Sequence, residues 1–221
     1  MLVSFSNVID EDINDRVIAL HDAFAVDYFT GLIETVPAYA SLAVFYDPLL
    51  IKKFHPGELS TYPFVKQHTE DLLKRLETRQ EKTVNPPSRI PVHYNGEDLP
   101  ELAALHKMTV DELIALHSAK NYRVYMIGFM PGFAYMGKLD ERIATPRKAT
   151  PRTRVPAGSV GIAGSQTGIY PFSTPGGWQL IGTTPLQLFD AEKTQPGLLR
   201  AGDTVQFFSI DEETFKQFNE H

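Results

Sequence analysis

The N-terminal third of the chain alternates between strand-like and helical patterns. Apolar residues recur at helical spacing over residues 10–26 and 63–81, which predicts two amphipathic helices. Short apolar runs at residues 2–5, 32–36 and 42–46 predict three strands, the last one ended by Asp47-Pro48. The order strand, helix, two strands, helix predicts an α+β sandwich of ferredoxin-like type, with residues 89–94 as the candidate for its last strand.

A stiff linker separates this pattern from the rest of the chain. Residues 85–88 read Asn-Pro-Pro-Ser, and two prolines with polar neighbours are typical of a semi-rigid connection. We therefore predict a small α+β N-terminal domain at residues 1–88 and a second domain at residues 89–221. Two short helices are expected next. In the second of these, Thr109 and Glu112 form a capping box, which predicts a helix from Val110 to about His117.

Short β segments dominate the remainder of the chain. A strong strand is expected at residues 122–129, and weaker ones at residues 160–163, 178–181, 186–189 and 204–210. Glycine and proline separate these segments. Many short strands with turn signals between them predict a β-barrel or a β-sandwich.

Composition narrows the class of protein. The 221 residues are 43% hydrophobic and 22% charged, which is ordinary for a globular protein. The absence of cysteine excludes disulfides, thiol nucleophiles and cysteine-based zinc sites. The start of the chain lacks the features of a signal peptide, and no apolar run approaches the roughly 20 residues of a membrane span, so we expect a soluble, cytoplasmic protein. A net charge of −6 argues against nucleic-acid binding.

Charge is distributed unevenly along the chain. No Asp or Glu occurs from Arg142 through Phe189. Five cations lie in the same segment: Arg142, Arg147, Lys148, Arg152 and Arg154. Such a run is usually a solvated basic loop. Three interspersed prolines stiffen this one and lower the cost of holding its arginines in place, so the pattern favours an anion site.

A glycine-rich run follows the cations. Four glycines lie within residues 158–168, and glycine lets backbone N–H groups approach an anion closely. In β proteins such glycines often mark only bulges and turns. The run is neither a Walker A sequence nor a dinucleotide fingerprint, because it has no Gly-Lys-Ser/Thr ending and no helix follows.

Large aromatic side chains cluster in two irregular segments. Phe129, Phe133 and Tyr135 lie among glycines and prolines at residues 128–137, and Trp178, the only tryptophan, follows Gly176-Gly177. These residues suit either a packed loop over the barrel mouth or the wall of an apolar pocket. For Trp178 a core position behind a tight hairpin turn is the equal alternative.

The acid-free segment offers no group suited to proton transfer. It also lacks His, and its Lys148 and Tyr170 start with pKa values near 10. It therefore suits binding and charge stabilisation. A base would have to come from a partner chain or from His93, Glu97, Asp98 or His117. His117 has an equally good structural explanation, because a cation is favoured at a helix C-terminus. The seven histidines show no metal-ligand spacing, so no metal site is predicted.

Four segments in this order carry a family resemblance. They are LHSAKNYRVYMIGFMPGFAYMGKLD, PRKATPRTRVPAGSVGIAG, QTGIYPFSTPGGWQLIGTTPLQLFD and GDTVQF. The chain resembles the family of the 5-oxoprolinase B subunit, also called allophanate hydrolase subunit 1, which includes an inhibitor of a sporulation sensor histidine kinase. The match is dense over residues 90–208 and looser before them.

The resemblance implies a cyclophilin-like β-barrel behind a small α/β domain. It also implies two partner chains: a C subunit, which has a related barrel, and an A subunit. The complete enzyme would open 5-oxo-L-proline, a small cyclic amide with a carboxylate, to L-glutamate with hydrolysis of ATP. ATP, with Mg if needed, would be held by the complex rather than by this chain, which would be inactive alone. In urea carboxylase a similar pair is fused as the carboxyltransferase part.

Motif residues of the family fall on individual positions of this chain, and the reaction that the resemblance implies suggests their roles. His117 and Arg154 are the expected catalytic residues. Substrate or anion binding is expected from Arg147, Arg152, Arg154, Gly158, Ser159, Gln166 and Tyr170. A pocket or interface is expected from Phe129, Phe133, Tyr135 and Trp178. Thr183 stands where many members have Arg, and Lys148 replaces a usual Arg.

Three alternatives stay open at this point. The fold can inhibit a histidine kinase by covering its helical domain, which needs a surface rather than a site. The substrate can be allophanate or another urea derivative instead of 5-oxoproline. A cyclophilin-like prolyl isomerase ranks last, since that resemblance concerns the fold alone. The oligomeric state is also open, a homo-oligomer included.

Overall fold

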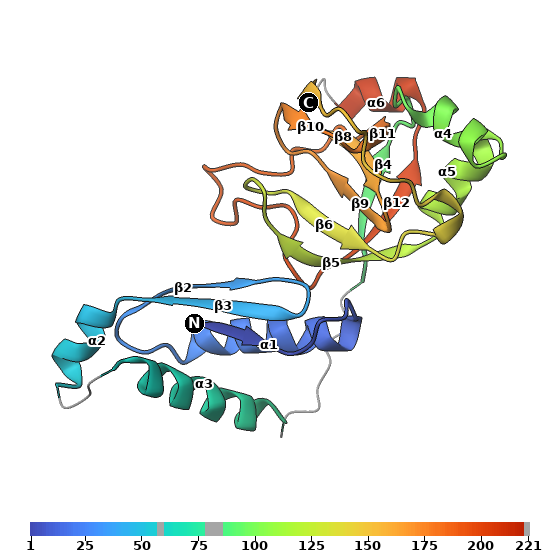
Figure 1. Cartoon of the computed structure of the whole chain (residues 1–221). Helices are drawn as coiled ribbons and strands as arrows, with labels where there is room; N and C mark the ends of the chain where they lie inside the picture. The colour runs from blue at the N-terminus through green and yellow to red at the C-terminus, as the bar shows by residue number, and fades with distance from the viewer. Residues whose placement is uncertain (57–59, 78–85, 219–221) are drawn as a thin grey trace. The chain divides into compact units, whose positions relative to one another are not determined.

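The computed structural model describes residues 1–56, 60–77 and 86–218 (Figure 1). The chain divides into two compact units, Met1–Val84 and Asn85–His221. Asn85, the first residue of the predicted linker, lies outside the described residues, and Ser88 already begins a strand. None of the described helices has the length and apolar character needed to cross a membrane.

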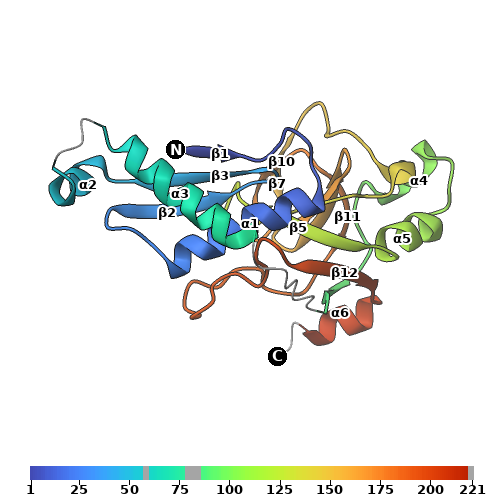
Figure 2. The ribbon, with the colours of Figure 1, turned by 90° about the horizontal axis from the view of Figure 1, so that it is seen from below.

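The first unit combines one small sheet with helices. Its described elements are β1 (Leu2–Ser4), α1 (Glu11–Val26), β2 (Leu32–Pro37), β3 (Ser41–Tyr46), α2 (Pro48–Phe54) and α3 (Tyr62–Glu77). The strands form an antiparallel sheet in the order β1-β3-β2. Helices α1 and α3 cover one face of it, where Leu20, Phe24 and Val65 pack against Leu42 and Val44 (Figure 1, Figure 2).

Asp47-Pro48 has a second role beyond ending a strand. The Asp47 carboxylate accepts hydrogen bonds from the N–H groups of Leu49 and Leu50, at 2.8 and 3.1 Å. Pro48 occupies the first helical position, where its missing N–H costs nothing. The pair therefore starts helix α2, which the hydrophobic pattern did not predict.

The three predicted strands of this unit are confirmed, but its ferredoxin-like fold is not. A ferredoxin-like sandwich needs a fourth strand, for which residues 89–94 were the candidate. The structure places that segment in the second unit as β4 (Ser88–Val92), paired in parallel with β12 (Thr204–Ser209). The predicted end of the second helix, at residue 81, lies outside the described residues.

The second unit is built around a seven-stranded sheet in the order β11-β8-β9-β6-β5-β12-β4. Its remaining elements are α4 (Leu99–Leu105), α5 (Val110–Ser118), β5 (Asn121–Ile127), β6 (Ala134–Gly137), a 3-10 turn (Glu141–Ile143), β7 (Arg152–Val155), β8 (Ser159–Ala163), β9 (Gln166–Ile169), β10 (Thr174–Gly176), β11 (Gln179–Thr183) and α6 (Glu212–Phe218). Strands β7 and β10 form a separate antiparallel ribbon.

The edges of the large sheet nearly meet. His93, just beyond β4, and Thr183 in β11 exchange two backbone hydrogen bonds, at 2.8 and 2.9 Å. This bridge brings the sheet close to a closed barrel around an apolar interior that includes Ile90, Met136 and Ile181. The barrel expectation is thus confirmed, and its cyclophilin-like character stays a prediction. The strand expected at residues 186–189 is wrong, because that segment sends Leu188 into the core but pairs only through a single bridge of Phe189.

The predicted capping box is present at the start of α5. Thr109 Oγ1 accepts from the Glu112 N–H, and the Glu112 carboxylate accepts from the Thr109 N–H at 2.7 Å. The helix ends near His117, as expected. Its position fixes where that histidine enters the barrel.

His117 is fully buried inside the barrel and stacks on Phe207 at 4.6 Å between ring centroids. Its Nε2 lies 2.9 Å from Thr167 Oγ1, whose hydroxyl donates to the Gly161 carbonyl, so Nε2 carries the proton. Its Nδ1 then accepts from the Tyr94 hydroxyl at 2.8 Å. Burial lowers the pKa of His117 to about 3, so the interpretation as a helix-end cation is wrong.

The neutral state of His117 makes stability depend on pH. The unfolded chain binds a proton near the ordinary pKa of 6.5, whereas the folded chain does so only near 3. Stability is therefore complete above pH 6.5 and declines as the pH falls, by about 2 kcal/mol between pH 7 and 5. Urea unfolding followed by Trp178 fluorescence measures this. A His117→Gln variant should be less stable at pH 7, but its free energy of unfolding should fall by about 2 kcal/mol less between pH 7 and 5 than that of the wild type. The same fall in both proteins would contradict the prediction.

Candidate functional site

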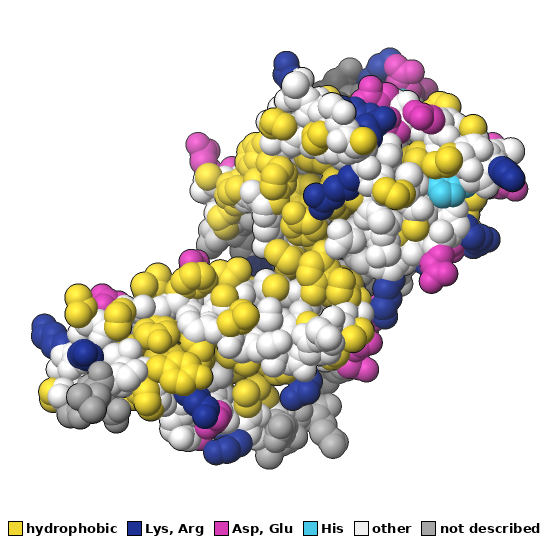
Figure 3. Space-filling view, in the orientation of Figure 1, with side chains coloured by type: hydrophobic (Ala, Val, Ile, Leu, Met, Phe, Trp, Pro, Cys, Tyr) yellow, Lys and Arg dark blue, Asp and Glu magenta, His cyan; other side chains and the backbone are white. Residues whose placement is uncertain are grey.

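A pocket of about 230 Å³ opens on the second unit. Its walls are lined by Phe129, Phe133, Tyr135, Arg147, Pro151, Tyr170, Pro175, Gly176, Gly177 and Trp178. On the face that Figure 3 shows, hydrophobic side chains gather on this unit around a small group of basic ones. Among the described residues, the lining contains one cation and no carboxylate.

Phe133 is the centre of the aromatic wall. It is fully buried, and its ring centroid lies 4.8 Å from that of Tyr135 and 5.4 Å from those of Tyr170 and Trp178. All three contacts are edge-to-face, the arrangement that aromatic quadrupoles favour. The packed-loop and pocket-wall interpretations both hold, because the same ring closes the core and lines the pocket.

Phe129 projects from the loop between β5 and β6. The residue is 61% exposed, and its ring meets that of Phe133 edge-on at 5.5 Å between centroids. Its φ of 66° is in the left-handed region that non-glycine residues rarely adopt. The tight loop, with Gly132 also at positive φ, thus holds an apolar side chain at the rim of the pocket.

Arg147 supplies the charge of the pocket. Its guanidinium carbon lies 5.7 Å from the centre of the Trp178 ring, within the range of a cation–π contact. Within the part of the chain that the structure describes, no carboxylate pairs with it. The residues on either side of Arg147 are hydrogen-bonded to the segment that contains Trp178. The Lys148 N–H donates to the Gly177 carbonyl at 2.7 Å, and Gln179 Nε2 donates to the Pro146 carbonyl at 3.0 Å.

Tyr170 brings a buried hydroxyl to the same pocket. Burial raises its pKa, against the opposing effects of a hydrogen bond with the Trp178 backbone and of the charges of Arg147 and Arg152. The hydroxyl therefore stays protonated near neutral pH. Gly176 lies directly against it, since a Cβ at Gly176 would come within 2.5 Å of the hydroxyl oxygen.

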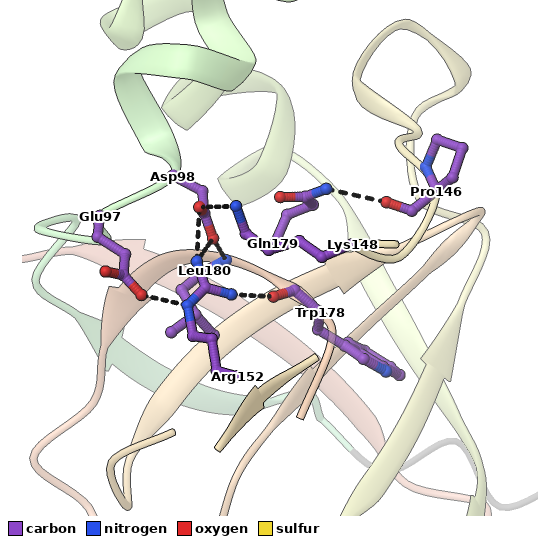
Figure 4. Close-up of polar contacts among 8 residues, drawn as sticks. All are labelled: Glu97, Asp98, Pro146, Lys148, Arg152, Trp178, Gln179 and Leu180. Atoms are coloured by element: carbon purple, nitrogen blue, oxygen red, sulfur yellow. Dashed lines mark hydrogen bonds and ion pairs between the residues drawn. The ribbon is translucent and has the colours of Figure 1, made fainter. Parts of the chain in front are cut away.

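Arg152 is paired with carboxylates of its own chain. Its Nη2 donates to Asp98 at 2.6 Å, its Nη1 donates to the Trp178 carbonyl at 3.1 Å, and its Nε pairs with Glu97 (Figure 4). These contacts use all three nitrogens of the guanidinium, and the expectation that Arg152 binds a substrate anion stays a prediction.

Asp98 is the buried partner that collects these charges. Only 4% of its side chain is exposed, and its carboxylate also accepts from Lys148 Nζ and from the Leu180 N–H, both at 2.7 Å. Burial alone would raise the pKa of Asp98, but the bonds from Lys148, Leu180 and Arg152 outweigh it and hold the pKa below its ordinary value.

Other predicted site residues lie outside the pocket lining. Arg154 is exposed and donates to Ser173 Oγ at 3.1 Å. The Gly158 N–H is already bonded to the Tyr170 carbonyl at 2.7 Å, so it is not available to an anion. Ser159 is buried in β8, and Gln166 lies in β9. His117 is enclosed in the barrel core and does not line the pocket.

The structure brings together two of the predicted anion-binding residues, Arg147 and Tyr170, with all four predicted pocket residues. Sequence reasoning gave no pocket role to Pro151 and Pro175, whose rigid rings complete the walls. It treated Asp98 only as a candidate base. Within the described residues no group of three or more His, Asp or Glu side chains is arranged to hold a metal ion.

Comparisons with known proteins identify the family. The model of the carboxyltransferase domain, subdomain C and D, matches residues 1–199. The chain is 45% identical to the B subunit of 5-oxoprolinase from Bacillus subtilis (strain 168) over 225 residues, covering all of this chain and 93% of that protein.

The chain belongs to the family of the 5-oxoprolinase B subunit.

Two further relatives agree in different ways. The 5-oxoprolinase B subunit of Haemophilus influenzae is 61% identical over 121 residues, covering 53% of this chain and 57% of that protein. The crystal structure of TTHA0988 superposes with a TM-score of 0.80 at 36% identity, covering 96% of this chain. The present family member spans 39% of the TTHA0988 chain, so there the same fold is part of a longer polypeptide.

Alanine variants of two pocket phenylalanines should differ in stability in this member of the 5-oxoprolinase B-subunit family. Phe133→Ala should reduce the free energy of unfolding by about 3–5 kcal/mol, because it opens a cavity among three rings. Phe129→Ala should cost less than about 1.5 kcal/mol, since it removes one edge contact of an exposed ring. Denaturant unfolding of both variants provides the comparison, and equal losses would show that the two rings are not placed as described.

Proposed function

We propose that this chain is the B subunit of an ATP-dependent 5-oxoprolinase, which acts with the C and A subunits to open 5-oxo-L-proline to L-glutamate. The observation that carries the proposal is the pocket itself, an aromatic cavity whose described lining holds a single cation, Arg147. 5-Oxoproline offers the matching groups: one carboxylate, one small ring and one lactam amide. The sequence similarity to two proteins named as 5-oxoprolinase B subunits supports the same function.

The proposed binding mode follows from the residues of the pocket. The Arg147 guanidinium takes the carboxylate, where a charge-assisted hydrogen bond is strong. The rings of Phe133 and Trp178 enclose the apolar face of the lactam. The protonated Tyr170 hydroxyl is a donor for the lactam oxygen, on which negative charge grows when the ring is attacked.

The pocket does not fit ATP. Its volume of about 230 Å³ lies below the roughly 300–1,000 Å³ usual for sites of larger ligands, and one cation does not match a triphosphate. Its described lining also has no carboxylate to hold Mg. ATP is therefore proposed to bind outside this pocket, in the assembled complex. The base that moves protons is assigned to the partners as well, because none of the described lining residues is His, Asp or Glu.

Reconstitution tests the proposed function. Phosphate release from ATP and glutamate formation are measured with 5-oxoproline for this chain alone, with the C subunit, and with the C and A subunits together. Turnover in the full mixture only is the expected result. If the folded and associated full mixture shows no turnover with 5-oxoproline but does with allophanate, the substrate assignment is wrong. If it turns over neither, the enzyme function itself fails, and inhibition of a sensor histidine kinase becomes the better hypothesis.

Arg147 and Arg154 form a matched pair of variants. Arg147→Ala should lower kcat/KM for 5-oxoproline by about 10- to 100-fold, the equivalent of one charge-assisted hydrogen bond. Arg154→Ala should stay near the wild-type value, since that exposed side chain contacts Ser173 and does not line the pocket. Steady-state kinetics of the assembled complex gives both values. A larger loss for Arg154 would restore the role expected from the sequence and remove Arg147 from the binding site.

A further inference from the structure

Asp98 does not line the pocket but connects two of the segments that form its walls, apart from the aromatic wall around Phe133. The first wall, residues 147–151, contributes Arg147 and Pro151, and the second wall, residues 175–178, contributes Pro175, Gly176, Gly177 and Trp178. Asp98 precedes helix α4, far from both segments in the sequence.

Contacts with the first wall are ionic. The Asp98 carboxylate accepts from Lys148 Nζ at 2.7 Å and from Arg152 Nη2 at 2.6 Å (Figure 4). Each of these two cations directly follows a pocket-lining residue in the sequence. Arg147 is the neighbour of Lys148, and Pro151 is the neighbour of Arg152. The backbone between the two cations is therefore tied to one buried carboxylate at both of its ends.

Contacts with the second wall run through the backbone. The Leu180 N–H donates to Asp98 Oδ2 at 2.7 Å, and the Asp98 N–H donates to the Leu180 carbonyl at 3.1 Å. Arg152, held by Asp98, donates in turn to the Trp178 carbonyl at 3.1 Å. The position of the Trp178 ring relative to the first wall thus depends on the same carboxylate.

The charge of Asp98 also decides which cation is available to a ligand. Without the Asp98 carboxylate, Lys148 and Arg152 would lose the counter-ion that they share. Arg152 would keep its exposed partner Glu97, and Lys148 would be left beside it without a carboxylate. Like charges at short range repel each other, and the first wall would shift to separate them. With the carboxylate, both cations are occupied, and Arg147 is left as the cation of the described pocket lining.

We propose that Asp98 is a positioning residue of the pocket, whose ionised carboxylate fixes the spacing of the two walls and keeps Arg147 over the Trp178 ring. It acts through Lys148, Arg152 and Leu180 and does not touch the ligand. The ligand is the 5-oxoproline of the proposed function, but the positioning of the walls is independent of that assignment.

The chain offers a direct probe and a matched control. Trp178 is the only tryptophan, so its fluorescence reports on the pocket. Asp140 is also a carboxylate paired with two cations, Arg142 at 2.9 Å and Lys120 at 3.7 Å, but it contacts neither wall. Asp98→Asn removes the charge that connects the two walls, and Asp140→Asn removes a comparable charge elsewhere in the same unit.

The first measurement needs no ligand. Emission maximum and acrylamide quenching of Trp178 are compared for wild type, Asp98→Asn and Asp140→Asn, after circular dichroism shows that each is folded. We expect a shifted emission and stronger quenching in Asp98→Asn only. A folded Asp98→Asn with wild-type emission and quenching overturns the proposal, whatever the ligand is.

The second measurement uses the assembled complex and 5-oxoproline. Loss of positioning should raise KM by about tenfold, the equivalent of about 1.4 kcal/mol of binding, with kcat changed less. A merely structural role would reduce the amount of active complex and lower the apparent kcat at an unchanged KM, and that result also overturns the proposal. Asp140→Asn should keep both constants.

A milder variant covers the case in which Asp98→Asn does not fold. Lys148→Met removes one partner of Asp98 and leaves the pair with Arg152, so it should shift Trp178 emission and raise KM in the same direction by a smaller factor. Wild-type emission and KM in Lys148→Met would then overturn the proposal. If the wild-type complex neither binds nor turns over 5-oxoproline, the proposed function fails, while the emission comparison still decides the role of Asp98.

Discussion

A carboxylate taken out of water must be paired with cations or hydrogen-bond donors, and two walls of the pocket in the second unit are held together by one such carboxylate. Asp98 is almost completely buried, and it draws Lys148, Arg152 and the Leu180 N–H onto its two oxygens. These contacts join the start of α4, strand β11 and the start of β7 with the loop that precedes it. Removal of one partner from a buried ion pair costs far more than the pair itself contributes, so the three segments are constrained together.

The ion pairs of Asp98 change the interpretation of the acid-free segment as an anion site. Five cations in a segment without Asp or Glu predicted an anion site built from several arginines. The structure pairs Arg142 with Asp140 and pairs Lys148 and Arg152 with Asp98. Of the other two cations, Arg154 is exposed beside Ser173, and Arg147 lies beside the aromatic rings of the pocket. A site for one carboxylate at a single guanidinium is chemically different from a site for phosphates, and it suits a small monoanionic ligand.

Features that depend on neighbours in the sequence were predictable, and those that depend on distant partners were not. The capping box of Thr109 and Glu112, the strands of the first unit and the pocket aromatics follow from local patterns. The partner of Arg152 lies 54 residues away, so no local pattern indicates that this arginine is occupied. The same reason explains β4, which was expected to join the nearest sheet in sequence but pairs with β12 instead. His117 was placed correctly at a helix end, but only the tertiary structure shows that this end is buried.

The pairing of β4 with β12 also bears on the order in which the protein can fold during its synthesis. The sheet of the first unit is complete once β3 has been made, and α3, the last described helix of that unit, ends at Glu77. The barrel is different, because its earliest strand, Ser88–Val92, finds its parallel neighbour only when Thr204–Ser209 has left the ribosome. Contacts so far apart in sequence form slowly, since a long loop must close first. The nascent second unit therefore exposes an unpaired strand edge for most of its synthesis, the period in which a chaperone would protect it.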